Sequence, residues 1–141
     1  MRRNQIRDIL EKTKVIAVVG LSKEPGKDSH RVAAYMQQHG YRIIPVNPFV
    51  EAVLGEKSYK TLLDIPAEIQ KTIDMVDVFR RSEDVPPIVQ QAIEMKEKVG
   101  GSFVVWIQLG IVNESAAEAA RQAGLVVVMD KCLMVEHQQL S

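Results

Sequence analysis

The chain has 141 residues, of which 46% are apolar and 26% are charged. This length suffices for one domain with a sizeable core and is too short for two, so we expect residues 1–141 to form a single domain. The 18 Lys and Arg residues balance the 18 Asp and Glu residues, which leaves room only for a local basic patch. No apolar run reaches the roughly 20 residues of a membrane span. We therefore expect neither a nucleic acid nor a membrane as a partner.

Cysteine and histidine are sparse. The single cysteine, Cys132, cannot form an intramolecular disulfide or a cysteine-based zinc site, and the N-terminal stretch lacks the apolar centre of a signal peptide. His30, His39 and His137 are scattered, which argues against a metal site, and His137 lies near a C-terminus that we expect to fray. A reducing cytoplasm is the expected compartment.

Short apolar runs alternate with amphipathic helical patterns along the chain. The aliphatic run 15–19 ends at Gly20, as expected for a strand buried on both faces of a sheet. The apolar residues of 85–93 have the i, i+3, i+4 spacing of a helix, whose first turn tolerates Pro86 and Pro87. In chain order we predict a helix over 4–13, a strand over 15–19, a helix capped by Asp28 or Ser29 and ended by Gly40, a strand over 41–46, a strand over 75–79, a helix capped by Ser82 and ended by Gly100 and Gly101, a strand over 103–107, a helix from Asn113 to Gly124, and a strand over 125–129.

The alternation of helices with buried strands implies right-handed βαβ crossovers. We therefore predict an α/β fold with an open parallel sheet of about five strands and helices on both faces. Pro45 cannot donate to a central ladder, so the strand over 41–46 is expected near an edge of the sheet. Residues 49–70 are expected to be irregular, with a short strand near 58–59 and a helical turn near 62–63.

The turn after the first strand is the expected ligand site, because ligands of open parallel sheets lie beyond the carboxyl ends of the strands. Gly20 permits a sharp turn, Ser22 and Ser29 offer hydroxyl groups, and Lys27 offers a positive charge beside a helix N-terminus. These groups suit a phosphate or pyrophosphate. A polar loop with a solvated lysine fits the same residues equally well.

Two common nucleotide motifs are absent. The dinucleotide fingerprint Gly-x-Gly-x-x-Gly is not met, because Ser22 and Pro25 follow Gly20 at the other two glycine positions. The second strand ends with Asn47 and Pro48 instead of the acid that would hold a ribose 2′-hydroxyl. The spacing of a Walker loop is also missing. An NAD-dependent dehydrogenase and a P-loop NTPase are therefore disfavoured.

Seven segments in order carry a family resemblance: VVGLS (18–22), KDS (27–29), GYRIIPVNP (40–48), LGEKSY (54–59), VDVFR (76–80), WIQLG (106–110) and MDKC (129–132). Together they resemble the small stand-alone coenzyme A-binding proteins, which are related to the N-terminal domain of the succinyl-CoA synthetase α subunit. The resemblance extends from about Val15 to about His137. It implies a Rossmann-like sheet that holds coenzyme A (CoA) by its pyrophosphate and its adenine-ribose part, and it implies no known reaction.

The residues agree with a CoA site. A carboxylate at the end of the second strand would repel the 3′-phosphate of CoA, so its absence fits this ligand. Candidate contacts are Gly20, Ser22, Lys27 and Ser29 for the phosphates, Leu21 in the same turn, Asn47 and Pro48 for the ribose or adenine, Phe79 for an apolar face, Arg80 or Arg81 for a phosphate, and Gln108 just past a strand end.

Three functions remain open. The ligase relatives carry a phosphorylated histidine on a following domain, so we expect CoA or acyl-CoA binding by a carrier, sensor or regulatory module without ligase activity, and no enzyme. Alternatively, Cys132 serves a small thiol-dependent acyl or disulfide exchange enzyme, although a lone cysteine beside an apolar strand is most often a buried hydrophobe. The third possibility is another nucleotide cofactor, such as NADP. A monomer or a weak homodimer is expected.

Overall fold

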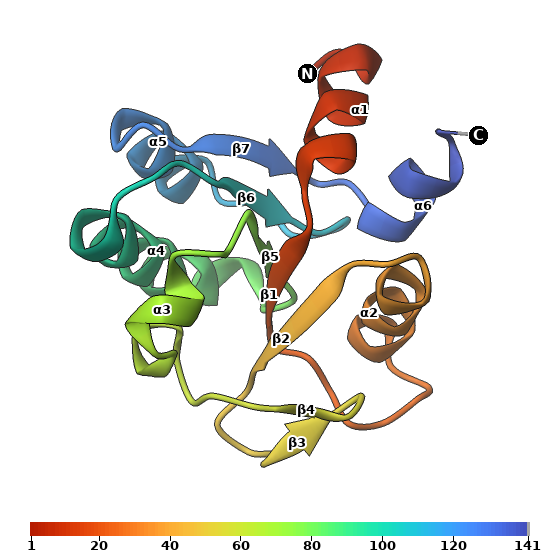
Figure 1. The fold of residues 1–141 in the computed structure, drawn as a ribbon. Coiled ribbons are helices and arrows are strands. Elements are labelled where there is room, and N and C mark those ends of the chain that lie inside the picture. The colour runs from red at the N-terminus through yellow and green to blue at the C-terminus, as the bar shows by residue number, and fades with distance from the viewer. Residues whose placement is uncertain (141) are drawn as a thin grey trace.

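A parallel sheet forms the centre of the molecule, and helices cover both of its faces (Figure 1). The computed structural model describes residues 1–140. The sheet has five strands in the order β2-β1-β5-β6-β7, all parallel. Its strands are β1 (Val15–Val19), β2 (Arg42–Val46), β5 (Met75–Val78), β6 (Val104–Ile107) and β7 (Val126–Met129). The predicted α/β, Rossmann-like fold is confirmed.

The helices divide between two hydrophobic cores, one on each face of the sheet. One core contains apolar residues of α4 (Val85–Val99), α5 (Glu114–Gln122) and η1 (Leu62–Asp64). Ile65 and Ile73, on either side of α3 (Ala67–Gln70), belong to the same core. The other core contains apolar residues of α1 (Arg3–Lys12), α2 (Asp28–Gln38) and α6 (Leu133–Gln138). Because β1, β5 and β6 are buried on both sides, their sequences are almost continuously apolar. Among the described residues, no helix is both long enough and apolar enough to cross a membrane.

Pro45 lies in the edge strand β2, as predicted. The neighbouring Val46 faces β1, since its carbonyl accepts from the Gly20 N–H at 2.9 Å. Pro45 therefore faces the outer edge, where its carbonyl accepts from the Tyr59 N–H at 3.1 Å. The backbone N–H at position 45 would face this outer edge and not β1. Proline, which has no N–H, therefore costs no hydrogen bond between β2 and β1.

Two predicted helix caps have different outcomes. The Asn113 side chain accepts from the Ala116 N–H at 3.0 Å and caps α5, which confirms the prediction. Ser82 does not cap α4, because it lies in a preceding 3₁₀ turn, η2 (Ser82–Asp84). Its hydroxyl instead accepts from the Val112 N–H at 3.0 Å and holds the loop after β6.

Residues 49–70 are irregular except for short elements. A hairpin of β3 (Ala52–Val53) and β4 (Glu56–Lys57) precedes Tyr59, which forms a single parallel bridge with Val46. The helical turn expected near residues 62–63 is η1. Near the C-terminus, where fraying was expected, the chain forms helix α6 (Leu133–Gln138), and its Leu133 is completely buried.

Candidate functional site: a cleft beyond the ends of β5 and β6

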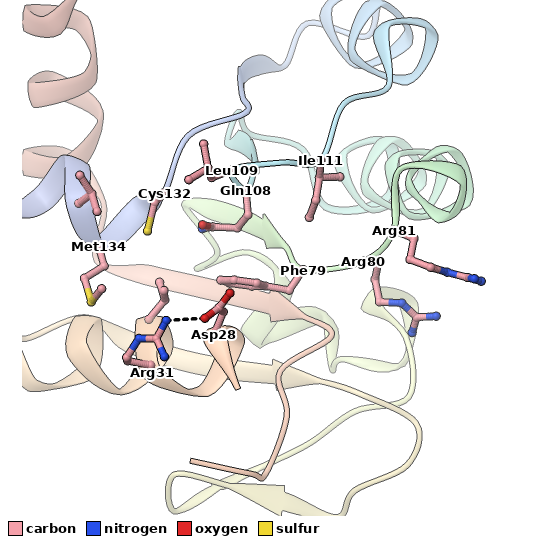
Figure 2. A pocket seen from close by; sticks show the side chains of 12 residues that line it. Asp28, Arg31, Phe79, Arg80, Arg81, Gln108, Leu109, Ile111, Cys132 and Met134 are labelled. Atoms are coloured by element: carbon pink, nitrogen blue, oxygen red, sulfur yellow. Dashed lines mark hydrogen bonds and ion pairs between the residues drawn. The ribbon is translucent and has the colours of Figure 1, made fainter. Parts of the chain in front are cut away.

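A cleft of about 490 Å³ opens beyond the carboxyl ends of β5 and β6, between α2 and α6 (Figure 2). Its walls come from four segments that are distant in the sequence. These supply Asp28 and Arg31 from α2, Phe79 and Arg80 after β5, Gln108 and Leu109 after β6, and Cys132 and Met134 at the start of α6. This is the edge of the sheet where ligands of open α/β folds bind.

The charged groups at the cleft are already paired with one another. Arg31 forms an ion pair with Asp28, one turn earlier on α2. Arg80 and Arg81 share Asp84, whose Oδ2 lies 3.6 Å from Arg80 and 3.1 Å from Arg81 Nε. These pairs are solvent-exposed, and such pairs contribute little to stability. An incoming phosphate can therefore compete for either arginine.

Gly20 joins the first turn to the segment after β5. Its φ is +88°, and a Cβ on Gly20 would lie 2.4 Å from the Phe79 carbonyl oxygen and 2.9 Å from Arg80 Cδ. Only glycine fits both the conformation and this close approach. The space that glycine provides is thus filled by the protein's own backbone, and it brings the first turn against the wall of the cleft.

Internal hydrogen bonds shape the loop between β1 and α2. The Ser29 hydroxyl accepts from the Ser22 N–H at 2.9 Å, and the Ser22 hydroxyl accepts from the Glu24 N–H at 3.0 Å. Neither Asp28 nor Ser29 caps α2, since the helix begins at Asp28 and Lys27 occupies the cap position. Lys27 is exposed and its side chain does not cap the helix, so it leaves the first N–H groups of α2 without a side-chain cap.

The end of β2 is fastened to the same turn. Asn47 Nδ2 donates to the Leu21 carbonyl at 2.9 Å, and the Leu21 side chain is fully buried. Pro48 lines a second hollow of about 240 Å³, together with Lys60 and Arg80. Arg80 therefore lines both hollows.

Four of the ten predicted contact residues line the cleft or the second hollow, and six line neither. Phe79, Arg80 and Gln108 line the cleft, and Pro48 and Arg80 line the second hollow. The six that line neither hollow form the backbone turn, its hydrogen bonds and the start of α2: Gly20, Leu21, Ser22, Lys27, Ser29 and Asn47.

Gln108 is 3% exposed although it lines the cleft. Its Nε2 donates to Asp77 Oδ1 at 2.7 Å, and its Oε1 accepts from the Leu133 N–H at 3.4 Å. Burial raises the pKa of Asp77 from its ordinary 3.8 to about 7, and the hydrogen bond from Gln108 opposes this rise.

Helix α6, which the sequence analysis missed, forms one wall of the cleft. Its His137 Nδ1 lies 2.8 Å from the Tyr35 hydroxyl, and the ring packs edge-on against His39 of the α2 C-terminus and against Tyr41. Burial and the nearby His39 lower the pKa of His137. Leu133 and His137 are four residues apart, which is the spacing of one helix face and would have indicated this helix.

Cys132 stands at the start of α6 and is partly exposed to the cleft. Among residues 1–140, no group of three His, Cys, Asp or Glu side chains is placed to hold a metal ion.

The chain is similar to several known proteins. It is 43% identical over 133 residues to YneT, an uncharacterized protein of Bacillus subtilis, across 94% of this chain and 92% of YneT. It is 29% identical over 111 residues to the ADP-forming acetate–CoA ligase II of Archaeoglobus fulgidus, across 77% of this chain but 16% of the ligase. The solved structure of a hypothetical protein from Pyrococcus horikoshii matches with a TM-score of 0.88 and 40% identity, across 99% of this chain and 92% of that one.

Residues 14–138 match the family described as CoA binding domain. The matched range contains the whole sheet, the turn at Gly20 and both hollows. This match confirms the resemblance to small CoA-binding proteins. The chain therefore belongs to the CoA binding domain family.

Proposed function

We propose that the protein binds coenzyme A or an acyl-CoA at the turn after β1 and acts as a carrier, sensor or regulatory module. The observation that carries this proposal is the family match over residues 14–138. The two hollows support it, because Arg80 lines both of them and a long ligand can extend from one to the other along this side chain.

Each part of CoA finds a suitable surface in this arrangement. The first N–H groups of α2, with Lys27 beside them, suit the pyrophosphate. The larger cleft, with Phe79, Leu109 and Met134 in its walls, suits the mostly apolar pantetheine arm. The hollow at Pro48 and Lys60 suits the adenosine and its 3′-phosphate.

We infer that the domain contributes binding without ligation. The chain matches 16% of the length of the acetate–CoA ligase II, so most of that ligase has no counterpart in the matched region. Neither the cleft nor the second hollow presents a histidine for a phosphorylated intermediate.

Calorimetric titration of the purified protein with CoA, NAD and NADP tests the proposal. We expect CoA to bind and the two dinucleotides to bind far more weakly. Absence of heat and of a thermal shift with millimolar CoA would overturn the proposal, and tighter binding of NADP would replace CoA as the ligand.

Lys27 and Lys23 provide a matched pair for locating the phosphates, because both are exposed lysines of the same loop. Lys27→Ala should weaken CoA binding about threefold to tenfold, as expected for one charge-assisted contact. Lys23→Ala should leave it nearly unchanged. Equal effects of the two substitutions would place the phosphates elsewhere.

A second candidate function rests on the partial exposure of Cys132 in the cleft wall. Its thiolate would attack a CoA disulfide, form a mixed disulfide with one CoA and release the other CoA as a thiol. Incubation with CoA disulfide followed by intact-protein mass spectrometry tests this chemistry. The mass of one CoA adduct, absent in Cys132→Ser, would support it, and an unchanged mass would exclude it.

A further inference from the structure

Asp77 is a carboxylic acid in the middle of the core. It lies on the central strand β5, between Val18 of β1 and Trp106 of β6, and is 1% exposed. Its Oδ1 accepts from Gln108 Nε2, while its Oδ2 has no hydrogen-bond partner among the described residues. Burying a carboxyl group with one oxygen unpaired is costly, and the neighbouring positions of β5 are filled by apolar residues. The packing of the sheet therefore does not explain Asp77.

The contact that Asp77 makes fixes the orientation of the Gln108 amide. Asp77 Oδ1 accepts a hydrogen bond, so the amide nitrogen must face it at 2.7 Å. The Leu133 N–H is a donor, so the amide oxygen must face the start of α6, where the distance is 3.4 Å. Both partners thus select the same orientation. If the amide were flipped, Gln108 Nε2 would face the Leu133 N–H, and two hydrogen-bond donors would oppose each other.

The amide oriented in this way belongs to the wall of the cleft. Figure 2 shows Gln108 extending toward the side of the cleft where Cys132 lies. A carbonyl oxygen has two lone pairs, and the long contact with Leu133 occupies one of them. Oε1 can therefore accept a second hydrogen bond from a bound molecule.

We propose that Asp77 is a positioning residue for CoA: it turns Gln108 Nε2 into the core and leaves Oε1 as the acceptor that meets the ligand. This inference rests on the proposed CoA binding. The pantetheine arm carries amide N–H groups and a thiol, which are the donors that such an oxygen accepts. Asp77 acts through Gln108 and does not itself line the cleft.

Three single variants and the double variant Asp77→Leu/Gln108→Met test the proposal by calorimetric titration with CoA. Asp77→Leu removes the acceptor and should weaken CoA binding about fivefold to tenfold, the effect of one lost hydrogen bond. Asp77→Asn keeps an acceptor oxygen and should retain affinity within about twofold. Gln108→Met should weaken binding like Asp77→Leu, and the double variant should be no weaker than Gln108→Met, because two residues of one hydrogen-bonded unit are not additive. Thermal unfolding of each variant checks that it is folded.

The outcomes separate this proposal from CoA binding itself. If the wild-type protein does not bind CoA, both proposals fail. If it binds and Asp77→Leu binds equally well, if Asp77→Asn is as weak as Asp77→Leu, or if the losses of the double variant add, only the positioning role is overturned.

A measurement on the unaltered protein decides the question should Asp77→Leu fail to fold. The side-chain amide signal of Gln108 in ¹⁵N–¹H spectra should shift when CoA is added to saturation. A signal that does not respond to bound CoA would overturn the positioning role.

Discussion

Gly20 and Phe79 meet backbone to backbone, so closely that a Cβ on Gly20 would lie 2.4 Å from the Phe79 carbonyl oxygen. This contact links the turn after β1 to the segment that carries Arg80. The glycine therefore has a packing role in addition to its conformational one, and the shape of the cleft depends on it.

Gly20→Ala should destabilise the fold and weaken CoA binding. The methyl group adds a backbone collision to the strain of a φ of +88°, so we expect a loss of roughly 2–4 kcal/mol in the free energy of unfolding. Gly40→Ala is the matched control, because Gly40 has a similar φ of +93° and, apart from its two chain neighbours, no described residue has an atom within 4 Å of the added Cβ. It should cost only about 1 kcal/mol. Chemical denaturation measures both values, and equal losses would contradict the close contact.

The architecture could be predicted because each of its signals is local. Each feature depends on residues close in the sequence. The aliphatic run 15–19 indicates a buried strand, Asn113 indicates the start of a helix, and Pro45 indicates an edge strand. The ends of the elements are harder to predict, because a side chain with the residue type of a cap can instead bond to a distant segment. Ser82, for example, has the residue type of a cap, but its hydroxyl bonds to Val112 thirty residues away.

The site could be predicted only in part, because its shape depends on contacts between distant segments. The residue types at Phe79, Arg80 and Gln108 placed them at the ligand edge, and they line the cleft. The sequence does not show that Gln108 would be nearly buried, or that its amide would donate a hydrogen bond to Asp77, thirty-one positions earlier. It does not show that α6 would close one side of the cleft, since that helix is held by packing on α2.

Asp77 should make stability fall as pH rises toward neutrality. Its pKa is about 7 in the folded protein and 3.8 ordinarily, so between these values the folded state holds a proton that the unfolded state has lost. The stability it contributes is complete below about pH 4 and is lost as pH rises through 7. The change is on the order of a few kcal/mol.

Asp77→Asn isolates this contribution, because asparagine has the same shape and does not titrate. Urea unfolding at pH 5 and pH 8 should show the wild type losing stability relative to Asp77→Asn at the higher pH. A difference between the two proteins that stays constant across this range would mean that Asp77 titrates normally.

His137 should act in the opposite direction and at lower pH. Its pKa is lowered in the folded protein, so the unfolded state binds the proton more readily, and stability is lost as pH falls below the ordinary value of 6.5. Protonation also places a charge beside His39, whose ring centroid lies 5.0 Å away. Acid should therefore loosen α6 from α2 before the sheet unfolds.

Hydrogen exchange of the α6 amides at pH 5 and pH 7 measures this loosening. Protection should decrease at pH 5 in the wild type and stay nearly constant in His137→Phe, which keeps an aromatic ring at this position and cannot be protonated. Gln139→Ala, at the exposed end of the same helix, should behave as the wild type does. A loss of protection at pH 5 in His137→Phe equal to that of the wild type would rule out His137 as the cause.

Arg80 should matter more for CoA than the neighbouring Arg81. Arg80 lines both hollows, whereas Arg81 lines only the cleft and forms ion pairs with both Glu83 and Asp84 at the surface. Arg80→Ala should weaken CoA binding about tenfold through the loss of a phosphate contact, and Arg81→Ala about twofold or less.

Titration of Arg80→Ala with CoA and with dephospho-CoA shows which phosphate Arg80 contacts. If Arg80 holds the 3′-phosphate, its removal affects dephospho-CoA little; if it holds the pyrophosphate, both ligands weaken alike. Retention of full affinity for both ligands in Arg80→Ala would show that the shared arginine does not touch the bound cofactor.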